Sequence, residues 1–474
     1  MRLARVLLCA TLATTSSITI LAQERRVSDP RVDALIADAR AVAPEFSADA
    51  LIRIAASSRI DHAKRRELLD EAFLRAYRAR DDHRLGTVLE IPPDTRQGAL
   101  RFAYATSLNR LSLQVRAAQM MASIDPSRAR EIFEWIELNL GPASCESLLV
   151  PSVDEYYTAL SLLARTAFTD RADGLRFLEL YLWRAHLPSE MPSVARAVQR
   201  FRPKREEAAY LETAVGWILD RASTDARGFS NASLELVTRM SDLQKADRAS
   251  GLTGWHLMEA LRTYLVTQLN GPRCSDSVME PLTAPAFNGE LQRIGADLDV
   301  KPIDARTLRP SKMLAAANLG PYWQTPESRR LHEDWLQLRG RGTALVPMAT
   351  RMELSWRNQA ALFLTAVEQW TGTREAERDY VYQKGVLLTG LIEIMPPSPV
   401  RSRAVRAFVE FMRHADGDRN QRALWFALLN RFLDSARGAD RRELLGALEE
   451  SHHAVLSLYA RLERTLGSRN RVIG

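Results

Sequence analysis

Cysteine is scarce in this chain of 474 residues, which contains only three. Cys9 falls in a start that we expect to be removed, so the mature chain keeps Cys145 and Cys274. No family signature surrounds Cys145, and a nucleophilic thiol would need a histidine partner, so we do not predict a catalytic cysteine. One even pair in an exported chain instead predicts a Cys145–Cys274 disulfide, with two separate buried thiols as the alternative.

Lysine is also rare, since only six of the 65 basic residues are lysine. The basic clusters are interrupted by acids, as where residues 200–205 run into Glu206 and Glu207. A nucleic-acid surface needs a basic stripe unbroken by acids. Removal of a start that carries Arg2 and Arg5 takes the formal charge from +7 to +5, which is mild for this length. We therefore predict no nucleic-acid partner.

Long apolar runs are missing after the first 22 residues, so we expect a mature chain that is soluble and does not span a membrane. The start itself has the pattern of a cleaved signal peptide over residues 1–22. Arg2 and Arg5 form a positive n-region, residues 6–22 are apolar enough for a signal core, and the small Ala22 precedes Gln23. An uncleaved amphipathic start is the alternative. We expect an exported protein, periplasmic or extracellular.

Motifs that carry chemistry are absent or incomplete. No Gly-x-Ser-x-Gly elbow occurs. His332-Glu333 begins like a zinc-protease helix, but Leu336 stands where the second histidine must be. His256 and Glu259 share a helix face, although a metal site would require matching carboxylates on other helices. The sequence predicts no cofactor and no metal, and it identifies no catalytic residue.

What the sequence has in abundance is helical spacing. In 63–79 the apolar residues repeat as adjacent pairs four residues apart, and these are Leu68, Leu69, Ala72, Phe73, Ala76 and Tyr77. The C-terminal segment forms one seam of steps of three and four, made of Leu445, Leu448, His452, Val455, Tyr459 and Leu462. We read His452 as a core histidine on that seam. Strand signals are few, so the fold class is all-α.

Start signals agree with this periodicity. A capping side chain precedes proline at Asp29-Pro30, Asp125-Pro126, Thr325-Pro326 and Ser398-Pro399, and each pair predicts a helix start. Ser152 and Glu155 have the spacing of a capping box. Together these signals predict an array of packed helical hairpins, either solenoid-like or a multi-helix bundle.

One stretch rich in proline interrupts the helices and suggests the domain division. It carries five prolines between residues 271 and 312, with a plausible helix around 287–294. We therefore expect an N-terminal helical array over 23–270, a connecting region over 271–312, and a C-terminal helical domain over 313–474.

Tryptophan is the residue type that could mark a ligand surface. Most of the nine sit at helical core spacing, namely Trp135, Trp217, Trp356, Trp370 and Trp425, and packing explains them first. The pair Tyr322-Trp323 follows Gly320-Pro321 in an expected turn, so we single it out as a possible aromatic platform.

These observations favour a non-enzymatic, exported helical-repeat protein that binds a protein or peptide in the cell envelope. The alternative is an enzyme of the helical-toroid kind that acts on polysaccharide or peptidoglycan. Its cleft would draw residues from distant segments, and the first candidates are His256, Glu259, Tyr322, Trp323 and Glu333. A purely structural spacer is a third hypothesis.

Overall fold

The structure is a computed structural model, and every structural statement below concerns the residues that it describes. These are residues 29–79, 85–87, 98, 102–103, 105–138, 140, 149–187, 190–222, 255–270, 284–294, 300–308, 322–343, 350–374, 376–415, 422–435 and 441–467. The expected signal peptide, Cys145 and Cys274 lie outside the described residues.

Helices dominate the described chain, which confirms the all-α fold class. The first part contains α1 (Pro30–Ala41), α2 (Pro44–Ala55), α3 (His62–Ala76), α5 (Arg110–Ala122), α6 (Pro126–Glu134), α7 (Asp154–Thr166), α8 (Arg171–Leu182), α9 (Met191–Phe201), α10 (Arg205–Ala222), α12 (Trp255–Asn270) and α13 (Ala284–Ile294). The second part contains α14 (Pro326–Thr343), α15 (Thr350–Gln369), α16 (Glu377–Ile394), α17 (Pro399–His414), α18 (Arg422–Ser435), α19 (Arg441–Glu450) and α20 (Ala454–Leu466). Two strands of three residues, β1 (Leu85–Thr87) and β2 (Leu149–Pro151), pair antiparallel.

The four helix starts predicted from capping residues and proline are confirmed. The side chains of Asp29, Asp125 and Ser398 accept hydrogen bonds from backbone N–H groups in the first turns of α1, α6 and α17. The Thr325 hydroxyl does the same for Ser328 at the start of α14. These caps work because the first turn of a helix leaves N–H groups without helical partners.

Two local predictions were wrong. Ser152 does not cap α7, whose N-cap is Val153 without a side-chain hydrogen bond. The continuous C-terminal seam is broken, because α19 ends at Glu450 and α20 begins at Ala454. His452 lies in the turn with a positive φ of 54° and is exposed, so it is not a core histidine. His453 caps α20 in place of a serine or aspartate, through its ring nitrogen. Neither glycine nor proline marks this turn, which is why the spacing concealed it.

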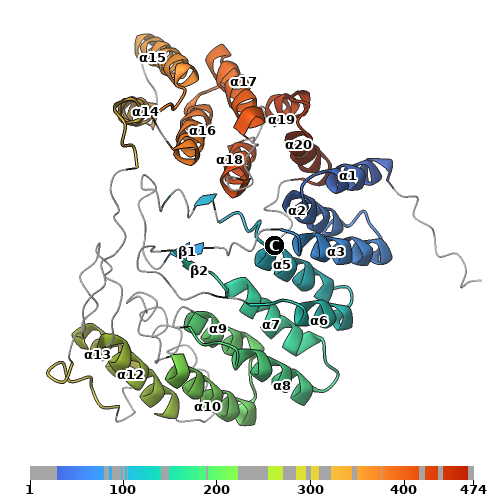
Figure 1. Cartoon of the computed structure of the whole chain (residues 1–474), viewed down its shortest axis with the longest axis vertical. Helices are drawn as coiled ribbons and strands as arrows, with labels where there is room; N and C mark the ends of the chain where they lie inside the picture. Colours follow the sequence, from blue (N-terminus) through green and yellow to red (C-terminus); the bar gives the residue numbers. More distant parts are fainter. Residues whose placement is uncertain are drawn as a thin grey trace, which may run out of the picture.

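The helices follow one another along an arc whose order differs from the order of the sequence (Figure 1). α14 and α15 lie at one end, and α16 to α20 follow. α20 then packs against α1 and α2, and the arc continues through α3 and α5 to α10 before it ends at α12 and α13. The first and last described helices therefore meet in the middle of the array. None of the helices in the described ranges is long and apolar enough to cross a membrane.

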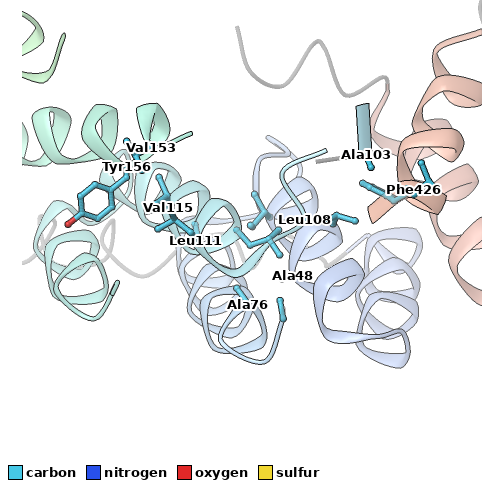
Figure 2. Packing of buried hydrophobic residues seen from close by; sticks show 14 of the residues in the cluster. Ala48, Ala76, Ala103, Leu108, Leu111, Val115, Val153, Tyr156 and Phe426 are labelled. Atoms are coloured by element: carbon cyan, nitrogen blue, oxygen red, sulfur yellow. The ribbon is translucent and has the colours of Figure 1, made fainter. Parts of the chain in front are cut away.

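The hydrophobic core runs through this meeting point, which we call the N–C junction and define as the contact of α1 and α2 with α18 and α20. Phe46 of α2 packs against Trp425 and Phe426 of α18, with ring centroids 5.7 and 5.6 Å apart. Figure 2 shows core side chains that extend from Phe426, past α2, to Tyr156 of α7. The predicted boundary between two helical domains stays a prediction, but their cores are continuous.

Neighbouring hairpins are joined by ion pairs at similar sequence separations. Arg171 binds Glu207, 36 residues away, at 2.7 Å. Glu393 binds Arg431, 38 residues away, also at 2.7 Å. Contacts between successive hairpins are typical of a repeat array, in which each hairpin contacts the next one.

Candidate binding surface

The candidate residues His256 and Glu259 both belong to helix α12. His256 belongs to α12, and its side chain is outside the described residues. Glu259 is half-buried and forms an ion pair with Arg262 one turn away, at 3.2 Å. This pair is of the kind that supports a helix surface.

The candidate residues near α14 serve mainly in packing. Tyr322 and Trp323 are both buried. The Trp323 ring stacks on the His332 ring with centroids 4.5 Å apart, and the Tyr322 hydroxyl donates a hydrogen bond to the carbonyl oxygen of Asp379. The turn that we expected to present an aromatic platform therefore holds its rings inside the fold. Glu333 is exposed on the outer side of α14.

The five candidates do not converge on one site, because α12 and α14 lie at opposite ends of the arc (Figure 1). Among the described residues, no group of three or more histidine, cysteine, aspartate or glutamate side chains is arranged to hold a metal ion.

Buried charged side chains do gather at the N–C junction, where they have structural partners. The Asp49 carboxylate accepts hydrogen bonds from Arg116 and from the Tyr459 hydroxyl, each at 2.8 Å. Burial lowers the pKa of Arg116, but the charge and hydrogen bond of Asp49 outweigh burial and hold the pKa above its ordinary value. Because both oxygens of Asp49 are occupied, this carboxylate is built to join α2, α5 and α20 and is poorly placed to act as a base.

The prediction that the tryptophans are core residues holds for three of the five and is wrong for two. Trp356, Trp370 and Trp425 are buried. Trp135 is 67% exposed and Trp217 is 64% exposed. Trp217 is followed by the buried Ile218 and Leu219. Because three apolar residues stand in a row, helical spacing alone did not show which of them face the core. Exposed tryptophan is uncommon on the free surface of a protein and frequent in interfaces.

Trp217 belongs to a cluster of exposed or half-exposed apolar side chains that we call the α8–α10 aromatic patch, made of Leu180, Trp183, Tyr210 and Trp217. Leu180, Tyr210 and Trp217 are exposed. The Trp183 and Trp217 rings lie edge to face, with centroids 5.9 Å apart and planes at 88°. Rings at right angles form a corner, which suits one inserted apolar side chain better than a flat ring.

The patch is held in place by hydrogen bonds on both helices. Glu179 accepts a hydrogen bond from the Trp183 indole N–H at 3.2 Å. Its hydrogen bond with Tyr210 raises the pKa of the Tyr210 hydroxyl. Arg221 of α10 donates to the backbone carbonyls of Trp183 and Ala185, which fixes the end of α8 against α10. The rings are thus ordered before any partner arrives, which reduces the entropy cost of binding.

The chemistry of the patch favours apolar contact. The carboxylate of Glu179 lies between Trp183 and Tyr210, and both side chains engage it. Three exposed charged residues lie in or next to the same two helices, namely Arg176, Arg184 and Asp220. An apolar centre with a polar rim is the usual composition of a protein interface. The available sequence signal was the spacing of Tyr210 and Trp217, two helical turns apart on one face.

Comparison with known proteins adds no relative: the chain matches no protein-family model, no curated protein and no solved structure.

Proposed function

We propose that this chain is an exported helical-repeat protein, without enzymatic activity, that binds a protein or peptide partner in the cell envelope through the α8–α10 aromatic patch. The observation that carries the proposal is the preorganised corner formed by the half-buried Trp183 and the exposed Trp217. Buried interface tryptophan and tyrosine dominate the binding energy of many complexes.

The nature of the partner follows from which groups of the patch are free to bind. A sugar needs hydrogen-bonding groups beside the ring on which it stacks, and the carboxylate of Glu179 is already engaged by Trp183 and Tyr210. A leucine, proline or similar side chain needs only the apolar corner. This difference favours a polypeptide over a polysaccharide.

Site-specific photo-crosslinking in intact envelopes tests the proposal. p-Benzoylphenylalanine in place of Tyr210 should yield one adduct of defined mass, sensitive to protease. The same probe in place of Tyr77 is the matched control, because Tyr77 is an exposed aromatic residue directly after α3 of the same array. Leu180→Asp should abolish the adduct while the protein stays folded, since Leu180 is exposed.

Three outcomes would refute this function: no adduct at position 210, the same adducts at position 77, or an adduct that survives Leu180→Asp. An adduct that resists protease and is removed by glycan-degrading enzymes would favour the polysaccharide alternative instead.

Export has its own test. Protein recovered from the envelope should begin at Gln23, and thiol titration of the denatured, unreduced chain should find no free cysteine if Cys145 and Cys274 are bonded. An intact N-terminus would contradict the signal peptide, and two labelled thiols would contradict the disulfide.

A further inference from the structure

The helix α2 owes part of its burial to the last helices of the chain. Every residue from Glu45 to Ala55 is buried. The helices α1, α3 and α5, which are close to α2 in the sequence, pack against it. So do α18, through the rings that meet Phe46, and α20. The packing of one of the first helices is therefore complete only when the last ones are in place.

Two hydrogen bonds of the same chemistry close very different lengths of chain. The Tyr459 hydroxyl donates to the Asp49 carboxylate at 2.8 Å across 410 residues. The Tyr157 hydroxyl donates to the Glu190 carboxylate at 2.9 Å across 33 residues. Because the probability of closing a flexible loop falls as about the 1.5 power of its length, the longer loop closes about 40 times less often. The helices α7 to α9 can thus pack before the N–C junction forms.

Synthesis of the chain adds to this difference. At about 5–20 residues per second, Tyr459 is made about 20–80 s after Asp49, whereas Glu190 is made about 2–7 s after Tyr157. During that interval α2 exists without α18 and α20. The local contacts of α7 to α9 are all available in the same interval.

The residues of α2 that meet the last helices suit a period of contact with water. The charged side chains Glu45, Asp49 and Arg53 each contact a polar side chain of α18 or α20 in the closed junction. Water hydrates such groups well, and removing them from water opposes part of the gain from their pairing. An open α2 is therefore better hydrated than a purely apolar helix face, and it is less prone to aggregate.

We propose that the N–C junction closes last when the chain folds, so that α1 and α2 reach their native packing only when α20 docks. The helix α1 shares this dependence, because it packs against α2 and α20. The consequence for export rests on the proposed function. If cleavage occurs before Gln23, the segment that directly follows the signal peptide is the segment that folds last, and it stays unfolded while the rest of the chain is made.

Pulse-labelling hydrogen exchange, read by mass spectrometry during refolding of the full mature chain, tests this order. Amides of α7 and α9 should gain protection in an early phase. Amides of α1, α2 and α20 should gain protection together in a later phase, because they depend on the same long-range contacts.

The two tyrosines provide a matched pair of variants, since each loses one buried hydroxyl that donates to a buried carboxylate. Tyr157→Phe should slow the early phase by about five-fold, because it removes a hydrogen bond that forms early. Tyr459→Phe should leave the early phase unchanged and speed the loss of protection in α2 and α20 during unfolding, because its hydrogen bond forms after that phase. Circular dichroism checks that both variants keep the helical fold.

Two results would overturn the proposal: protection of α1 and α2 in the same early phase as α7 and α9, or an early phase that Tyr459→Phe slows as much as Tyr157→Phe does. Because the purified chain is used, these results are independent of the N-terminus found in the envelope and of any partner. The folding order can therefore fail while the proposed function stands, and the reverse also holds.

Discussion

The ion pair of Arg53 with Glu463 joins residues 410 positions apart and makes a sharp test of the N–C junction. The two side chains are buried and lie 2.6 Å apart. Glu463→Leu would leave the Arg53 guanidinium buried without its carboxylate. Breaking a buried pair from one side costs about 3–5 kcal/mol, while replacing both partners by apolar residues is often close to neutral. The double variant Arg53→Met with Glu463→Leu should therefore recover most of the loss.

The expected change in melting temperature follows from the size of the chain. With about 2.1 cal/mol/K of unfolding entropy per residue, a cooperative unit of about 450 residues loses about 4 °C for 4 kcal/mol. Differential scanning calorimetry measures the melting temperatures of wild type, Arg53→Met, Glu463→Leu and the double variant. These four values form a double-mutant cycle for the ion pair. Arg441, the other partner of Glu463, is about one-third exposed and can be solvated by water when the carboxylate is removed.

Two results would refute the reasoning. A Glu463→Leu variant with the same melting temperature as wild type would show that α20 does not pack against α2 in solution. A double variant as unstable as the single one would show that the loss comes from packing and not from an unpaired buried charge.

The remaining predictions concern helix packing and pH. Gly390→Ala should destabilise the protein by about 1–3 kcal/mol, because the added Cβ would lie 2.6 Å from the Trp335 ring, whereas Gly289→Ala, with open space around it, should stabilise by up to about 1 kcal/mol. Equal effects of the two substitutions on the melting temperature would contradict the close packing of Gly390 against Trp335. The hydrogen bond from Arg171 holds the pKa of Glu207 below its ordinary value of 4.5. The stability from this pair is therefore complete above pH 4.5 and is lost as the pH falls through the lowered pKa. Glu207→Gln should reduce the acid-induced drop in melting temperature, and an unchanged profile would exclude the pair as its source.

Local signals in the sequence predicted local structure well. The proline-preceding caps at Asp29 and Ser398 located helix starts because the cap and the proline act within one turn. In α3 the paired spacing identified buried residues such as Leu69 and Phe73. Tyr77, at the end of that same pattern, directly follows α3 and is exposed.

Contacts between distant segments had no such signal. Nothing in the local pattern around Asp49 indicates that its carboxylate binds Tyr459, because apolar and polar spacing defines a face and not its partner. For the same reason, the sequence did not predict that Trp217 of the candidate binding surface is exposed. Trp217 and Trp425 both sit at helical spacing, yet one is exposed and the other is buried, since the difference depends on which helices lie alongside.

Hydrogen exchange of the mature protein tests most directly whether the N–C junction joins the first and last described helices into one array. In Glu463→Leu, amides of α2 and α20 should lose protection together, while those of α8 and α10 keep it, because the ion pair belongs to the N–C junction alone. Loss of protection confined to α20, with α2 unchanged, would contradict the packing of α20 on α2 that joins the array at the N–C junction.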